Sequence, residues 1–382
     1  MLKNSSRQSV MKTRVSDFEE VFFLRMMALG CLAVFVWLLW YKPPDWSLMD
    51  EPGLLSQIKK WFPHRKWWVY VSYYCESDVK YWGMFRPIFP LFVYFFYGFF
   101  GFSSQVAYSV NFAIMFSVLW GWSILFEYFI KDALPHDPAV KPKIWRYLFF
   151  VLCCLFTPHY NLIYYPTAQE KFTLLFGLPI YWSLLRMSHD KSRISLNAGL
   201  LIACLLLVLL SRASSLFMIP VIVFWIAAIH PDHMSNRLKI TLISIVAVIG
   251  VSFGRYFLSI RKVYTSGYKV VSLFDRFWSQ DLRYQLLFFF SLVGITCFSI
   301  IWWKFDKKHQ SEKFAKMLIW PLSILCYALI MLPWRGFSGY YSLTTGVFLI
   351  GTVLFFYGFL LIYSGPLIQA KAFLSIIRID PI

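Results

Sequence analysis

Three carboxylates lie close together in the polar stretch 43–53. Asp45, Asp50 and Glu51 fall within about ten residues of the end of an apolar run, in a segment bounded by prolines and a glycine. A carboxylate in such a place could take a proton from an acceptor hydroxyl, or orient a metal ion or a sugar. Ordinary solvation of a turn explains the same residues equally well. These acids are therefore the candidates for a general base.

Four arginines stand near the ends of apolar stretches: Arg86, Arg212, Arg276 and Arg335. A guanidinium can hold a phosphate group with two parallel hydrogen bonds, so we predict a phosphate-binding role for all four. The alternative for Arg86 is a side chain that reaches toward lipid headgroups. The alternative for Arg276, which lies in the basic segment 259–283, is a generic attraction to anionic lipid.

His159 and Glu170 bracket a predicted turn, and Tyr340 and Tyr341 follow closely after Arg335. Ionisable groups at the boundary of a membrane span are costly, which makes them functional candidates by default. We predict that these four residues contact substrate. Glu170 could instead form a structural ion pair with Lys171 or Arg212.

The elements that must position these residues follow from the composition. The 382 residues are 59% hydrophobic and only 15% charged, which is not the composition of a soluble globular protein. A spanning helix needs about 20 mostly apolar residues. The sequence predicts an all-α integral membrane protein with ten spans, at 22–41, 106–130, 147–165, 171–187, 195–211, 214–230, 240–258, 284–303, 317–334 and 340–363.

An eleventh apolar stretch, from Ile88 to Phe102, is too short to span and contains Pro90, Gly98 and Gly101. We predict a helix that lies in the membrane interface. If this stretch did span, every later loop would change sides. No internal repeat or low-complexity linker divides the chain, so residues 1–382 are predicted to form a single polytopic membrane domain.

The distribution of basic residues predicts the orientation. Short cytoplasmic loops carry excess Lys and Arg. Placing the N-terminal residues 1–21 inside puts at least two basic residues in every inside segment and leaves the tail 364–382 inside as well. The two larger loops, 42–105 with its interfacial helix and 259–283, then fall on the outer face. All the candidate site residues lie on that outer face.

Several classes of function are excluded or left open. The net charge of +18 is spread over many loops and not gathered on one soluble domain, which argues against a nucleic-acid partner. The sequence has no phosphate-binding Gly-rich loop, no Ser/His/Asp nucleophile motif and no zinc signature. Three acids in one loop would permit a divalent metal, Mg or Mn, but they show no recognisable ligand spacing.

A series of short stretches lies along the chain in a recognisable order: Asp45 or Asp50-Glu51, Phe85-Arg86-Pro87, Phe100-Gly101-Phe102, Tyr108-Ser109-Val110-Asn111, Pro158-His159 with Glu170, Ser211-Arg212-Ala213 with Pro220, and Arg335 with Tyr340-Tyr341 and Gly346. The order of these stretches resembles that of the GT-C superfamily of polytopic glycosyltransferases, in particular the branch of the protein O-mannosyltransferases and bacterial relatives.

The resemblance implies an enzyme that moves a single sugar from a polyprenyl-phosphate donor to an acceptor hydroxyl on the outer face, with inversion at the anomeric carbon. The acceptor would be a glycan, a lipid or a protein, and a bacterial inner membrane is favoured over the endoplasmic reticulum. In such an enzyme Asp50 or Glu51 would be the general base, and Asp45 is the alternative candidate for that role. The four arginines would stabilise the charge that grows on the departing phosphate.

Three other functions fit parts of the same pattern. An O-antigen-type polymerase or ligase also uses lipid-linked glycans and would make a long product. A lipid or solute transporter often has two related halves and broken helices near the midplane, which this chain does not show. A non-catalytic membrane subunit would keep its function after removal of all the outer acids.

Overall fold

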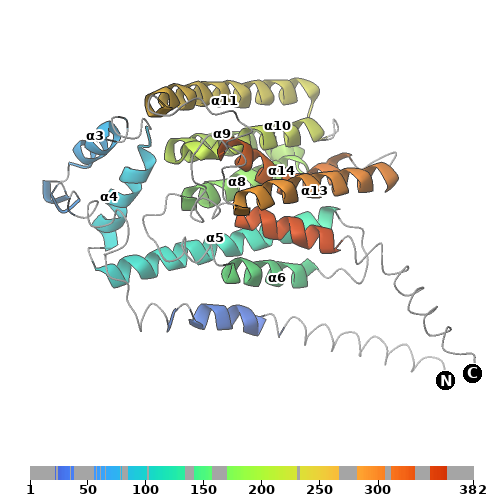
Figure 1. Ribbon diagram of the computed structural model, residues 1–382, viewed down its shortest axis with the longest axis horizontal. Coiled ribbons are helices and arrows are strands. Elements are labelled where there is room, and N and C mark those ends of the chain that lie inside the picture. Colours follow the sequence, from blue (N-terminus) through green and yellow to red (C-terminus); the bar gives the residue numbers. More distant parts are fainter. Residues whose placement is uncertain are drawn as a thin grey trace, which may run out of the picture.

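The computed structural model describes residues 22, 25–34, 36–37, 56, 58–60, 62–64, 66–77, 79, 85–100, 103–133, 142–156, 170–229, 233–265, 282–305, 311–331 and 345–358. Within these residues the structure is helical and contains no strand, so the predicted all-α class is confirmed (Figure 1). The candidate residues Asp45, Asp50, Glu51, His159, Arg276, Arg335, Tyr340 and Tyr341 lie outside the described residues.

Eight labelled helices make up the main bundle. They are α5 (Ser104–Ala133), α6 (Pro142–Leu155), α8 (Glu170–Met187), α9 (Ile194–Ser211), α10 (Met218–Ala228), α11 (Asn236–Thr265), α13 (Leu282–Phe305) and α14 (Ser311–Met331). Two further apolar helices, Arg25–Val34 and Gly346–Gly358, run beside them. Consecutive helices pack against each other, as α5 does on α6, α8 on α9 and α13 on α14 (Figure 1).

The core of the bundle is built from large aromatic side chains. Trp122, Trp225 and Trp320 are fully buried and come from α5, α10 and α14. The Trp122 indole N–H donates to the Leu174 carbonyl oxygen at 3.0 Å, which satisfies its polar edge. Helices that are apolar on nearly every face must be buried against each other or against lipid. The centre of the bundle therefore holds α5, α8, α10 and α14 together.

Large apolar residues also cover the outside of the bundle. Leu196 on α9 is 70% exposed, and Ile240 and Val248 on α11 are 66% and 65% exposed. A soluble monomer rarely exposes apolar side chains over such long helices. This surface is compatible with a lipid environment.

Three of the described helices are long and apolar enough to cross a bilayer: Gln105–Asp132, Lys191–Ser211 and Asn236–Arg255. Five of the shorter apolar helices fall at further predicted spans, and the sixth, Ile88–Phe100, lies in the apolar stretch predicted to be interfacial. The predicted span 147–165 begins earlier than expected, because α6 starts at Pro142, a residue favoured in the first turn of a helix. The predicted span 214–230 consists of a 3-10 turn, η4 (Ala213–Phe217), followed by α10.

The segment between the first span and α5 forms two helices at one end of the bundle, α3 (Trp67–Ser77) and α4 (Ile88–Phe100) (Figure 1). The 13 residues of α4 extend about 20 Å at 1.5 Å per residue, which is too short for a hydrocarbon core of about 30 Å. The length of α4 agrees with the predicted interfacial helix. The helix α3 was not predicted, and its buried Tyr70 packs on Tyr94 of α4 with ring centroids 5.6 Å apart.

Candidate functional site

Polar contacts gather at the two opposite ends of the bundle. Near the start of α5 and α8, Lys171 contacts Asn111, whereas at the other end His189, just after α8, contacts Asp132 in the last turn of α5. The two helices therefore run in the same direction. We call the region around Glu170, Lys171 and Arg212 the Glu170 end, and the region around Asp132, His189 and Lys316 the Asp132 end.

Glu170 is the first residue of α8, and its side chain is completely buried. A carboxylate in the first turn is stabilised by the unpaired backbone N–H groups and the positive end of the helix dipole. Nη2 of Arg212 lies 2.5 Å from its Oε1, and the side chain of Arg212 is only 12% exposed. Of the two ion pairs considered from the sequence, Glu170 forms the one with Arg212.

Arg212 owes its position to a break in the chain. The helix α9 ends at Ser211, and Arg212 adopts an extended conformation with φ −151° and ψ 114° before η4 begins. Its Nε donates to the Ser214 hydroxyl oxygen at 3.2 Å, so the guanidinium is fixed from two sides. The turn thus places the Arg212 guanidinium beside Glu170 at the N-terminus of α8.

The carboxylate of Glu170 retains hydrogen-bonding capacity. Within the described part of the chain neither of its buried oxygens has a hydrogen-bond partner, because the close contact of Oε1 with Arg212 does not have hydrogen-bond geometry. Buried polar atoms are almost always hydrogen-bonded, and an exception calls for an explanation. A hydroxyl or ammonium group of a ligand would satisfy it.

Next to Glu170, the side chain of Lys171 is buried as well, at 1% exposure. Its Nζ donates to Oδ1 of Asn111 on α5 at 2.6 Å and lies 5.8 Å from the ring centroid of Phe92 on α4. Two residues further along α8, the hydroxyls of Thr173 and Ser215 are hydrogen-bonded at 2.9 Å. The Glu170 end therefore joins α5, α8 and η4 through buried polar side chains and reaches α4 through the Phe92 ring.

The structure places three of the predicted site residues. Glu170 and Arg212, 42 positions apart, are brought into direct contact. Arg86 is half-buried just before α4, the helix whose Phe92 faces Lys171.

Two residues of this cluster, Lys171 and Asn111, were not predicted as site residues. Lys171 was considered only as a possible ion-pair partner of Glu170, and Asn111 only as the last residue of the stretch Tyr108-Ser109-Val110-Asn111. Both are polar residues within or at the edge of apolar stretches, and this signal could have identified them. The sequence cannot show that they meet, because 60 positions separate them.

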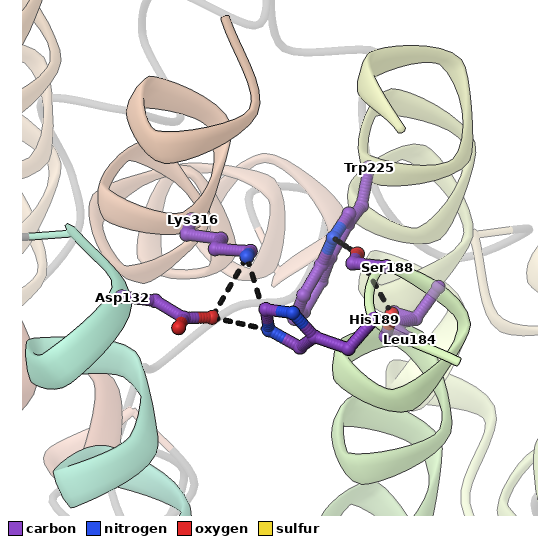
Figure 2. Close-up of polar contacts among 6 residues, drawn as sticks. All are labelled: Asp132, Leu184, Ser188, His189, Trp225 and Lys316. Carbon is purple, nitrogen blue, oxygen red and sulfur yellow. Dashed lines mark hydrogen bonds and ion pairs between the residues drawn. The ribbon is translucent and has the colours of Figure 1, made fainter. Parts of the chain in front are cut away.

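A second cluster lies at the Asp132 end and was not predicted (Figure 2). Oδ2 of Asp132 lies 2.5 Å from Nε2 of His189 and accepts a hydrogen bond from Nζ of Lys316 at 2.8 Å. Since a carboxylate oxygen can only accept, the imidazole proton must be on Nε2. The cluster connects the end of α5, the turn after α8 and the start of α14. These contacts hold together helices that are far apart in the sequence, which is typical of a structural role.

The same end holds a neighbouring chain of hydrogen bonds. The Trp225 indole N–H donates to the Ser188 hydroxyl at 3.3 Å, and that hydroxyl donates to the Leu184 carbonyl oxygen at 3.1 Å (Figure 2). The Ser188 hydroxyl is thus held by local backbone. It is not positioned as a nucleophile for His189.

The described residues contain no group of three or more His, Cys, Asp or Glu side chains that could hold a metal ion. The three acids proposed from the sequence as possible metal ligands lie outside this part of the chain. Their role in metal binding stays a prediction.

Comparison with protein families, with curated proteins and with solved structures gave no match for this chain.

Proposed function

We propose that the chain is a membrane glycosyltransferase that moves one sugar from a polyprenyl-phosphate donor to an acceptor hydroxyl, and that the reaction takes place at the Glu170 end. The observation that supports this most directly is the completely buried Glu170 carboxylate, which has unused hydrogen-bonding capacity beside Arg212. A site that must hold both sugar hydroxyls and a phosphate needs such a pair of groups. The carboxylate accepts from hydroxyls, and the guanidinium receives phosphate.

In this proposal the chain crosses the membrane ten times, with both termini in the cytoplasm and the Glu170 end on the outer face. Every loop that enters the Glu170 end is one that the charge distribution assigns to the outside. The Asp132 end lies among the short basic loops, with Lys131, Arg186 and Lys191 close to it in the sequence. The polar contacts at the two ends support the assignment of the loops to two faces.

The proposed roles divide between donor and acceptor. Arg212, with Arg86, Arg276 and Arg335, receives the lipid phosphate and stabilises the negative charge that develops as the bond from the sugar to the phosphate oxygen breaks. Asp50 or Glu51 takes the proton of the acceptor hydroxyl as the new glycosidic bond forms. Glu170 orients a sugar hydroxyl. A divalent metal near the first-loop acids would supply additional positive charge.

The test uses native mass spectrometry of the purified protein to detect a co-purifying polyprenyl-phosphate species, comparing the wild type with Arg212→Gln. The matched control is Asp132→Asn, which removes an ion-paired carboxylate at the opposite end. We expect the wild type and the control to retain the lipid-linked species and Arg212→Gln to lose it. Detection of bulk phospholipid alone in all three proteins would contradict the donor site.

A second measurement separates catalysis from binding. Asp50→Asn and Glu51→Gln are each assayed for donor retention and for transfer of the sugar identified from the mass of the bound lipid. We expect at least one of them to keep the donor and to lose turnover, because the amide cannot accept a proton. Wild-type turnover in both would refute the base assignment. A long glycan product in the wild type would favour the polymerase function.

A further inference from the structure

A second group of cations surrounds one tyrosine at the Asp132 end. Nε of Arg25, in the helix Arg25–Val34, donates to the Tyr147 hydroxyl oxygen at 3.1 Å. Nη2 of Arg146, on α6, donates to the same oxygen at 3.3 Å. The guanidinium of Arg146 also lies over the rings of Trp120 and Tyr147, at 5.2 and 4.9 Å from their centroids. Two positive groups from distant parts of the chain thus converge on a neutral phenol.

The charges in this group are only partly balanced. Oε2 of Glu127 lies 3.0 Å from Nη1 of Arg146, and its Oε1 lies 3.4 Å from Nζ of Lys131. Arg25 makes no ion pair with any described residue. Nε of Arg146 is buried and has no hydrogen-bond partner in the same part of the chain. The Glu127 carboxylate therefore pairs with two cations, Arg146 and Lys131, while Arg25 contacts only Tyr147 among the described residues, and one guanidinium N–H of Arg146 has no acceptor there.

The position of Arg25 makes this arrangement unlike ordinary surface charge. Arg25 lies three residues inside the predicted span 22–41, in a helical segment that packs on the core through Ala28, Cys31 and Leu32. An arginine at the boundary of such a helix is costly unless it meets an anion or water. Like charges that converge on one hydroxyl repel each other, and a bound anion removes this repulsion.

We infer that Arg25 and Arg146 bind the phosphate group of an anionic lipid headgroup, on the face of the membrane opposite the Glu170 end. The planar guanidinium groups match the geometry of phosphate oxygens, and Arg25 is exposed while the Arg146 side chain keeps 21% exposure. Tyr147 is the first residue of the predicted span 147–165 and is of an aromatic type that collects at the level of the headgroups. The inference rests on the membrane embedding in the proposed function and not on sugar transfer.

The experiment titrates the purified protein in detergent with phosphatidylglycerol and, separately, with phosphatidylcholine, and native mass spectrometry quantifies the bound lipid. We expect preferential binding of phosphatidylglycerol and about a fivefold loss of its affinity in Arg25→Gln. Arg25→Lys keeps the charge and should retain most of the affinity. The control Arg186→Gln removes an exposed cation at the same end that lies over the Trp182 ring, and it should bind like the wild type.

A second variant covers the case in which Arg25→Gln does not fold. Arg146→Lys keeps a positive charge beside Glu127 but loses the planar donor pair, and it should weaken phosphatidylglycerol binding in the same direction. Equal binding of the two lipids by the wild type would overturn the inference, as would undiminished phosphatidylglycerol binding in both variants.

Two further measurements follow. Competition with inorganic phosphate distinguishes a lipid phosphate from a free one, and extraction with alkaline carbonate tests whether the protein is embedded in the membrane. Retention of phosphatidylglycerol in excess inorganic phosphate supports a lipid ligand. Its replacement by inorganic phosphate, with the same dependence on Arg25, would overturn the lipid assignment. Release of the protein from membranes by alkaline carbonate would refute membrane embedding itself. If the protein transfers no sugar but still binds phosphatidylglycerol through Arg25, the proposed function is refuted and the lipid site is not.

Discussion

The ion pair between Glu170 and Arg212 can be tested by a double-mutant cycle. The variants are Glu170→Gln, Arg212→Gln and their combination. The pair has its closest atoms 2.5 Å apart, and the two side chains are 0% and 12% exposed. Two unit charges about 4 Å apart attract each other by about 4 kcal/mol at an effective dielectric constant of about 20. Removal of one partner from a buried pair costs about 3–5 kcal/mol, because the other charge stays buried without compensation.

We therefore expect each single variant to lower the free energy of unfolding by about 3 kcal/mol or more, and the double variant to lose little beyond either single one. The coupling energy should be about 3 kcal/mol. Unfolding in mixed micelles of detergent and SDS is followed by intrinsic fluorescence, for which the chain supplies 17 tryptophans.

The matched control is the exposed pair Asp190–Arg193, whose closest atoms are 3.9 Å apart. Solvent screens this pair, so Asp190→Asn and Arg193→Gln should show no measurable coupling. Additive effects of Glu170→Gln and Arg212→Gln, within about 0.5 kcal/mol, would refute the reasoning, since independent sites add within that range. The Glu170 end would then not contain a buried ion pair.

Two predictions concern packing. At Gly351 a Cβ atom would overlap the Trp320 ring, so Gly351→Ala should lower the free energy of unfolding by about 1–3 kcal/mol. Gly199 has open space around it, so Gly199→Ala should leave the free energy of unfolding unchanged or raise it by up to about 1 kcal/mol. Equal effects in the same unfolding assay would contradict the close packing. The buried Tyr70 hydroxyl has no hydrogen-bond partner among the described residues, so Tyr70→Phe should leave the free energy of unfolding unchanged or raise it by up to about 1 kcal/mol. Burial also raises the pKa of Tyr70 above its usual value of 10.0, so the wild type should lose stability more steeply than Tyr70→Phe as pH rises above about 10. Curves of equal steepness for the two proteins would show that this group is not responsible.

Much of the fold was predictable because it depends on local sequence. The length and apolarity of a stretch determine whether it forms a long helix, and α5, α9 and α11 lie at predicted spans. The shortness of the apolar run at Ile88 likewise led to a helix that cannot cross the bilayer. The helix α3 was missed because its aromatic residues follow no clear helical period, and because they were explained by anchoring at the interface.

The sequence by itself therefore determined the all-helical class, the approximate positions of the apolar helices and the candidacy of Glu170 and Arg212 as boundary charges. Only the tertiary structure decided which charges meet. It paired Glu170 with Arg212 and not with its neighbour Lys171, and it brought Lys316 to Asp132 across 184 positions. The physical reason is that helix formation depends on neighbouring residues, whereas side-chain contacts between helices depend on how the whole bundle packs.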